Sequence, residues 1–128
     1  MKPGSVAVVG AAESTELGKL PHISNTQLHA DAALNAMADC GIGPGDIDGI
    51  ATARENPIEI AHYLGIKPRY VDGTGVGGCS FMIHVRHAVA AIESGMANTI
   101  LITHGESGRS QVGICLLYTS DAADEWLR

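Results

Sequence analysis

The chain has 128 residues, of which 45% are hydrophobic, and a formal net charge of −6, as expected of a protein that buries a single core. Lysine and arginine total 8 against 14 acidic residues and form no basic run, which argues against a nucleic-acid partner. No signal peptide or membrane span is recognisable, and the 3 cysteines are too widely spaced for a disulfide framework. We therefore expect a cytoplasmic protein with no membrane partner.

The first expected element is a buried strand. Residues 5–10 form a continuous apolar run that ends in glycine, which is typical of a strand covered on both faces in a parallel sheet. The loop that follows, over residues 11–24, is long for an α/β connection, and such loops often line a site. We expect the strand to lie in the middle of the sheet, with Val8 buried.

A helix, a strand and a second helix are expected next. Asn25 or Thr26 can cap a helix that has one apolar face and ends at glycine-rich residues 41–45. Residues 46–52 read as a short strand. Residues 56–65 read as a short helix with proline in its first turn and glycine after its end.

Residues 69–95 carry a strand, a glycine-rich turn and a helix. The turn holds 4 glycines in residues 73–78, and apolar residues then recur at helical spacing, which predicts a largely buried helix. Glycines let the backbone approach a ligand closely, and a helix start presents unpaired N–H groups. Gly75, Gly77 and Ser80 are therefore candidate substrate-binding residues.

Residues 98–104 form a second wholly apolar strand. His104 and Glu106 stand at its carboxyl end, where ligands bind in open α/β sheets, so both are candidate substrate-binding residues. The alternation of strands and helices predicts an α/β fold with a mostly parallel sheet and helices on both faces. We expect the strand at 69–72 on an edge and the strands at 5–10 and 98–104 in the middle.

Residues 73–78 also match the G-x-G-x-x-G pattern of dinucleotide-binding proteins. That pattern belongs in the first strand-helix unit, with an acidic residue about twenty positions further on after a second strand. Here it lies in the third unit, and the next acid along the chain, Glu93, falls inside the expected helix. We therefore interpret the match as accidental.

Cys79 is a candidate catalytic residue because a thiol in the first turn of a helix has its thiolate form favoured. The alternative is that Cys79 is a small apolar residue in a tight turn. His84 and His87 are three positions apart and could meet one ligand, but no third metal-binding residue clusters with them. We interpret them as core or rim histidines and expect no metal site.

With these residues in view, the chain resembles the amino-terminal half of a thiolase-superfamily protein, closest to the lipid-transfer-type (sterol-carrier-type) branch. The resemblance covers residues 3–114 and rests on four stretches: residues 6–10, 71–81, 88–95 and 99–106. It implies half of a thiolase fold, an acyl-CoA substrate with coenzyme A as part of it and no tightly bound cofactor, and a homodimer. In thiolases a cysteine opens the third helix and takes the acyl group, while the other catalytic residues come from the carboxyl half.

This chain departs from the family at that cysteine. By the spacing to Ile92 and Gly95, the family nucleophile falls on Gly78, one residue before Cys79. One position turns a helical side chain by about 100°, so Cys79 would not point where the family nucleophile points unless the turn has slipped. We favour loss of the nucleophile. Members of this branch without it include acyl-CoA retro-aldolases that pair with a small OB-fold partner.

The resemblance thus implies an enzyme of the acetyl-CoA acetyltransferase family that makes or breaks a carbon–carbon bond, and loss of the nucleophile favours retro-aldol cleavage. The alternative is a non-catalytic acyl- or lipid-binding subunit of a complex.

Residues 115–125 resemble the translation of a transposase adapter used in sequencing libraries. We therefore divide the chain into a truncated thiolase-like domain, residues 3–114, and a non-native tail, residues 115–128, and expect the fragment itself to be inactive.

Overall fold

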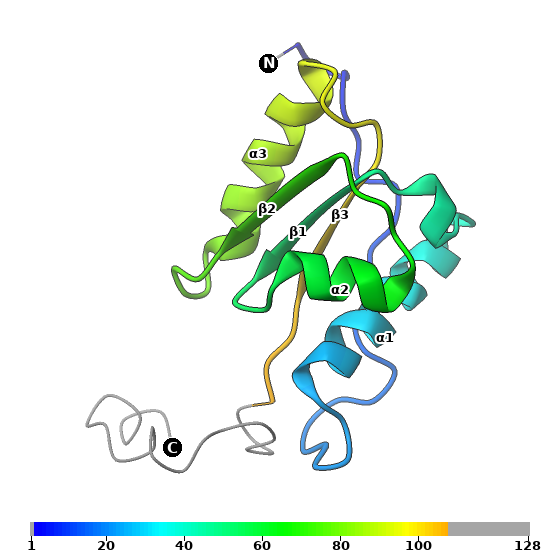
Figure 1. Cartoon of the computed structure of the whole chain (residues 1–128), viewed down its shortest axis with the longest axis vertical. Helices are drawn as coiled ribbons and strands as arrows, with labels where there is room; N and C mark the ends of the chain where they lie inside the picture. Colours follow the sequence, from blue (N-terminus) through cyan, green and yellow to red (C-terminus); the bar gives the residue numbers. More distant parts are fainter. Residues whose placement is uncertain (1, 108–128) are drawn as a thin grey trace.

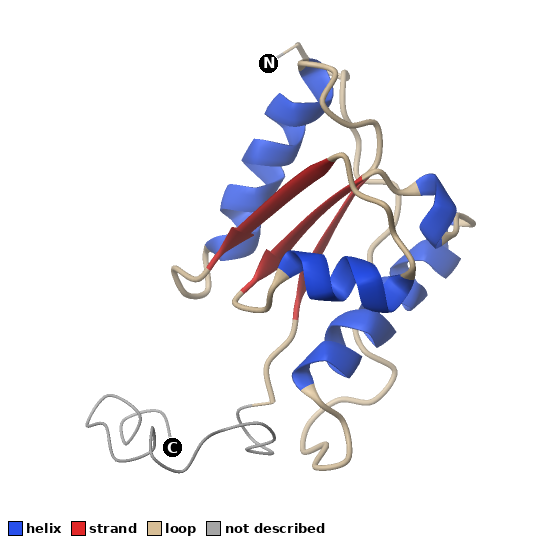
Figure 2. Ribbon diagram, in the orientation of Figure 1, coloured by secondary structure: helices blue, strands red, loops and turns tan. Residues whose placement is uncertain are grey.

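The computed structural model describes residues 2–107 and shows one parallel sheet with helices on both faces (Figure 1 and Figure 2). In chain order the elements are α1 (Asn25–Cys40), the 3-10 helix η1 (Pro44–Asp46), β1 (Gly49–Ala53), α2 (Pro57–Leu64), β2 (Tyr70–Thr74), α3 (Ser80–Glu93) and β3 (Ile100–His104). The strand order is β2-β1-β3. The predicted α/β fold class is confirmed.

The three strands are in register from end to end. Gly49 of β1 pairs with Tyr70 of β2 and with Ile100 of β3. At the other end Ala53 pairs with Thr74 and with His104. Because all strands run in the same direction, their carboxyl ends form one straight edge, from which three connecting segments leave the sheet.

Local capping chemistry sets the helix boundaries. Ser24, not Asn25 or Thr26 as predicted, caps α1. Its hydroxyl accepts a hydrogen bond from the backbone N–H of Gln27, and its own backbone N–H donates to the side-chain oxygen of Gln27. Helix α2 is as predicted, with the Asn56 side chain as its N-cap and Gly65 in the left-handed region, at φ 75°, after its end.

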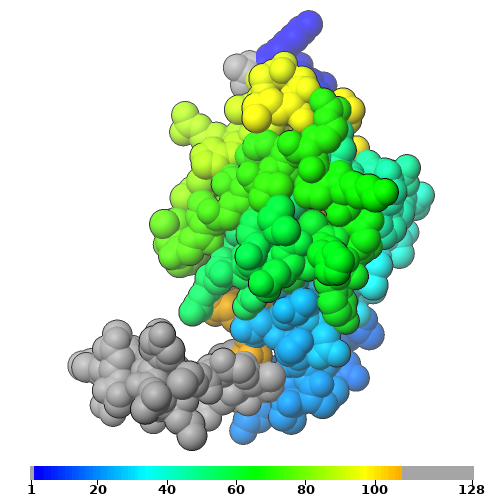
Figure 3. Space-filling view, viewed as in Figure 1, coloured from blue at the N-terminus to red at the C-terminus, as the bar shows by residue number. Residues whose placement is uncertain are grey.

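The main apolar core lies between the sheet and the helices α1 and α2. In Figure 3 the green segment that includes α2 covers the middle of the visible face, and blue residues of α1 and the loop before it lie at one end. Helix α3 packs against all three strands from the other side and buries mostly small side chains there. The core residues are Ala33, Met37, Ile47, Ile50, Ile60, Ala61, Ile66 and Leu101.

Residues 5–10 are not a strand, so the prediction of a central strand there is wrong. Val8 is 81% exposed and Val9 is 66% exposed. The middle of the sheet is taken by β1, which pairs directly with both β2 and β3. Within the described residues β3 is therefore an edge strand, and the prediction that residues 98–104 lie in the middle is wrong as well. The prediction that β2 lies on an edge is confirmed.

The segment over residues 5–10 instead runs from the end of α3 to the last turn of α1. A side chain at Gly10 would approach the Ala36 carbonyl oxygen of α1 to 2.5 Å, so the chain passes close to that helix. At its other end, the Ser5 hydroxyl and the Lys2 N–H both donate to the exposed carboxylate of Glu93 in α3.

Helix α3 is less buried than its apolar composition predicted. Phe81, Met82 and Val85 are exposed, whereas His84, Ala88 and Ala91 are buried. A helix on one face of a sheet covers only one of its own sides, which accounts for the difference.

Within residues 2–107 no helix is long and apolar enough to cross a membrane. The predicted tail, residues 115–128, and its boundary with the domain lie outside the described residues.

Candidate functional site

A cavity of about 390 Å³ lies at the carboxyl edge of the sheet. Its walls are the loop over residues 11–24, the first half of α1 and the residues that follow β3. The long loop therefore does line a cavity, as its length suggested. The lining residues are Ala12, Glu13, Ser14, Glu16, Leu17, Gly18, Leu20, Leu28, Ala32, His104, Gly105, Glu106 and Ser107.

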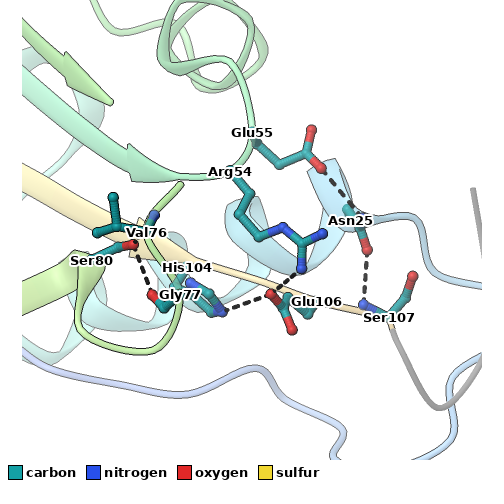
Figure 4. A network of polar contacts seen from close by, with 9 residues as sticks. All are labelled: Asn25, Arg54, Glu55, Val76, Gly77, Ser80, His104, Glu106 and Ser107. Carbon is teal, nitrogen blue, oxygen red and sulfur yellow. Dashed lines mark hydrogen bonds and ion pairs between the residues drawn. The ribbon is translucent and has the colours of Figure 1, made fainter. Parts of the chain in front are cut away.

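His104 and Glu106, predicted from their place at the carboxyl end of the last strand, both line this cavity. Their side chains lie together, with His104 Nε2 at 3.8 Å from Glu106 Oε1. The same carboxylate oxygen accepts a hydrogen bond of 2.5 Å from Arg54 Nη1 (Figure 4). An arginine and a histidine thus meet one carboxylate at the edge of the sheet.

Sequence reasoning missed Arg54, which directly follows β1. Arg54 has a φ of 74°, and no other non-glycine residue in the part of the chain that the structure describes has a positive φ. Side chains rarely adopt that conformation, and the residues that do cluster at functional sites. The Arg54 N–H donates to the Thr74 carbonyl at the end of β2, which helps to hold this backbone. The rule that identified His104, a position at the carboxyl end of a strand, applies equally to Arg54.

A second set of polar contacts joins the first turn of α1 to the same edge. The Asn25 side chain donates to Glu55 Oε1 at 3.3 Å and accepts from the Ser107 N–H at 2.9 Å (Figure 4). Thr52 in turn donates from its hydroxyl to the Glu55 carbonyl. These contacts fix the segments after β1 and β3 relative to α1.

The glycine-rich turn before α3 has two distinct parts. Gly77 requires glycine because its φ is 88°. Gly75 and Gly78 face open space, since a side chain at either position would meet no atom within 4 Å. Ser80 is buried, and its hydroxyl donates to the Gly77 carbonyl and accepts from the Val76 N–H, so that within this turn its polar atom is already used (Figure 4).

Cys79 is exposed at the N-cap of α3 and does not line the cavity. Its Sγ lies 3.7 Å from the Val76 carbonyl oxygen, a contact within its own turn. The structure therefore brings His104 and Glu106 together and leaves Cys79 apart from the cavity.

The two histidines of α3 serve different contacts. His84 is fully buried, its Nε2 lies 3.1 Å from the Thr74 hydroxyl, and burial lowers its pKa. His87 is partly exposed and its Nδ1 lies 2.6 Å from Asp72 Oδ2. Burial alone would raise the pKa of Asp72, but the hydrogen bonds from His87 and from the Gly73 N–H outweigh it, so that pKa is lowered. Within residues 2–107 no three metal-binding side chains cluster, so the described residues offer no metal site.

No protein-family model matches the chain. In an alignment of 114 positions that covers 86% of this chain, it is 32% identical to a steroid side-chain-cleaving aldolase of Thermomonospora curvata. Over the same length it is 31% identical to the 17-hydroxy-3-oxo-4-pregnene-20-carboxyl-CoA lyase of Mycobacterium tuberculosis. The chain spans only 29% of the length of each of these relatives.

Solved structures of thiolase-like proteins are also similar to this chain. The Ltp2-ChsH2(DUF35) aldolase is 28% identical and superposes with a TM-score of 0.74 over 95% of this chain and 32% of that one. The acetyl-CoA acetyltransferase of Syntrophomonas wolfei is 26% identical, with a TM-score of 0.68 over 91% of this chain and 32% of that one. A monomeric SCP2-thiolase like protein of Mycobacterium smegmatis is 28% identical, with a TM-score of 0.64 over 77% of this chain and 22% of that one. The resemblance to the thiolase superfamily, and to its sterol-carrier-type branch, is thereby confirmed, as is the thiolase-like α/β fold.

Proposed function

We propose that this chain is part of a thiolase-like enzyme that cleaves a carbon–carbon bond of an acyl-CoA by a retro-aldol reaction. The observation that carries the proposal is the similarity, at 32% and 31% identity, to two proteins named as an aldolase and a CoA lyase. The position of Cys79, exposed and outside the cavity, supports cleavage without a covalent acyl-thiol intermediate.

In this reaction a general base removes the proton of a β-hydroxyl group on the acyl chain. The bond between the α and β carbons breaks, the β carbon leaves as an aldehyde or ketone, and the electron pair passes to the α carbon as a thioester enolate. The enolate then takes up a proton at the α carbon. The step is balanced without an oxidant or a reductant, and coenzyme A takes part only as a portion of the substrate.

The residues around the cavity could supply a base and hold it. Glu106 and His104 are within reach of each other, and either can accept the hydroxyl proton. The Arg54 guanidinium hydrogen-bonds Glu106 and would hold its carboxyl group in place.

The intact protein is proposed to be a dimer that pairs with a small OB-fold protein. β2 is an edge strand with Val71 exposed, which leaves it open to pairing with another chain. The DUF35 domain in the name of one structural neighbour supports a partner protein. Sedimentation of the full-length protein should give at least a dimeric mass; a monomer, as in the Mycobacterium smegmatis neighbour, would contradict this.

The test is to express the full-length protein that contains this chain, with and without an OB-fold partner, and incubate it with β-hydroxyacyl-CoA substrates. Mass spectrometry should detect a shortened acyl-CoA and a released carbonyl compound. Glu106→Gln should lower the cleavage rate by about a hundredfold or more, the scale of losing a general base. Glu59→Gln, on the exposed surface of α2, is the matched control. Cleavage that depends on added free coenzyme A would indicate thiolysis instead, and substrate binding without turnover would favour an acyl-binding subunit.

A further inference from the structure

His29 lies outside the cavity but directly behind the segment that carries His104 and Glu106. It belongs to α1, where Asn25, Leu28 and His29 are spaced to share one helix face. Three contacts from this face reach residues 103–107, and each holds a different point of that segment.

The first contact is a buried hydrogen bond. His29 Nδ1 lies 2.7 Å from the Thr103 hydroxyl, and His29 is fully buried. Thr103 is the last residue but one of β3, so this bond ties α1 to the strand just before the chain enters the cavity wall.

The second contact is the packing of the backbone on the imidazole ring. A side chain at Gly105 would come within 2.8 Å of His29 Cδ2 and 3.3 Å of the His29 backbone nitrogen. Real side-chain carbons do not come as close as the first of these distances, so the absence of a side chain at residue 105 allows the segment to lie against the ring. Gly105 stands between His104 and Glu106, and its position therefore sets theirs.

The third contact is the hydrogen bond of 2.9 Å from the Ser107 N–H to Asn25 Oδ1. Together with the Thr103 bond it fixes both ends of the segment to one helix. Side chains that must stay in place at a site are held in this way by contacts behind them.

We infer that His29 is a positioning residue which, together with Asn25, clamps residues 103–107 to α1 and thereby sets the positions of His104 and Glu106 at the cavity. The clamp itself follows from the contacts above, whereas its importance for catalysis rests on the proposed function.

The chemistry of His29 fits this role. Burial lowers its pKa, the nearby Glu55 carboxylate opposes that effect, and His104 adds to it, so His29 is neutral at neutral pH. A neutral ring can hydrogen-bond the Thr103 hydroxyl without burying a charge. Its Nε2 has no hydrogen-bond partner among the described residues. A buried polar atom without a partner lowers the stability of the folded chain, and an apolar side chain at this position would avoid that loss.

The chain contains a natural control for this residue. His84 in α3 is also fully buried, also contacts a threonine hydroxyl near the end of a strand, and also has a ring nitrogen without a partner among residues 2–107. Its partner Thr74 leads into the glycine-rich turn, not into the cavity wall. The same substitution at His84 therefore removes the same kind of buried hydrogen bond as at His29, but away from residues 103–107.

The test is amide hydrogen exchange of the whole chain at neutral pH, followed at residues 105–107. His29→Phe keeps a ring but loses the hydrogen bond, and Thr103→Val removes the same bond from the other side, which guards against a folding defect in either variant. Both should raise exchange at 105–107 by about tenfold. His29→Asn, whose side-chain amide can replace Nδ1, should restore protection to within about twofold, and His84→Phe should leave these amides unchanged. Wild-type exchange in the first two variants, or an equal rise in His84→Phe, would overturn the inference.

A second measurement separates this inference from the proposed function. In the full-length enzyme His29→Phe should lower kcat for carbon–carbon cleavage with little change in KM, and His29→Asn should restore kcat. If exchange at 105–107 rises in His29→Phe while kcat stays the same, the clamp exists but its role in positioning catalytic groups is overturned. If no variant, including the wild type, cleaves the substrate while the exchange result holds, the proposed reaction has failed and the clamp stands.

Discussion

Cys79 distinguishes the two chemistries open to a thiolase-like chain. Its thiol is exposed, lies outside the cavity and contacts the Val76 carbonyl of its own turn, so we expect no covalent intermediate on it. Cys79→Ser in the full-length enzyme should therefore retain carbon–carbon cleavage within a few-fold, because a hydroxyl fills the same space. Steady-state kinetics would check this. A loss of about a thousandfold, the scale of losing a covalent nucleophile, would return the protein to the acyltransferases.

The buried histidines predict how stability depends on pH. Burial lowers the pKa of both His29 and His84 below the ordinary value of 6.5. Just below pH 6.5 these two imidazoles therefore bind protons in the unfolded chain but stay neutral in the folded chain. His29 faces Thr103, Glu55 and His104, and His84 faces Thr74, Asp72 and His87. Their contribution to stability is complete above pH 6.5 and is lost as the pH falls through the lowered folded-state pKa values.

The melting temperature should accordingly fall between about pH 7 and pH 5, in a range where the carboxyl groups are still mostly ionised. Calorimetry at several pH values would measure it. The variant with both His29→Asn and His84→Asn should show a flatter curve over this range. A wild-type curve that is equally flat would contradict the assignment of neutral, buried imidazoles.

Only part of the site could be predicted residue by residue. His104 and Glu106 were found because polar residues after an apolar strand are a local signal. The same signal covers Arg54, two residues after the strand expected at 46–52, but its positive φ and its backbone bond to the Thr74 carbonyl are properties of the folded chain that no local pattern indicates. The contacts of His29 with Thr103 and of Asn25 with Ser107 join residues far apart in the chain, and no local pattern indicates such pairs.

At the level of elements, strand β1 takes the central place in the sheet that was expected of residues 5–10. Val8→Ser should change the free energy of unfolding by no more than about 0.5 kcal/mol, since Val8 is exposed. Ile50→Ala in β1 should cost about 2–5 kcal/mol, because Ile50 is fully buried in the core. Urea denaturation of the two variants would measure both. A large cost for Val8→Ser would instead support the central strand that the sequence predicted.

The difference between these elements has a physical cause. A continuous apolar run shows that a segment favours an extended backbone, but it does not say which neighbour will pair with it. Helix α2, in contrast, was predicted with its boundaries, because Asn56, Pro57 and Gly65 act on the backbone within a turn of their own position.

For the whole molecule, the adapter-like sequence of residues 115–128 predicts that they contribute nothing to folding. A chain ending at residue 114 should have the same solubility and melting temperature as the longer one, as a thermal melt followed by circular dichroism would show. Its matched control is a second deletion that removes residues 2–14 instead, including the contacts of Lys2 and Ser5 with Glu93. A clear loss of folded protein on removing the tail would show that it is native.

The straight carboxyl edge of the sheet also bears on how such a chain can diverge. Ala53, Thr74 and His104 end their strands in one row, so the segments beyond them can gain or lose residues without disturbing the pairing. An insertion inside β3 would instead move His104 by about 3.3 Å along the strand and turn it to the opposite face. Relatives that have acquired new substrates should therefore differ in length after these three positions and keep each strand at the same length.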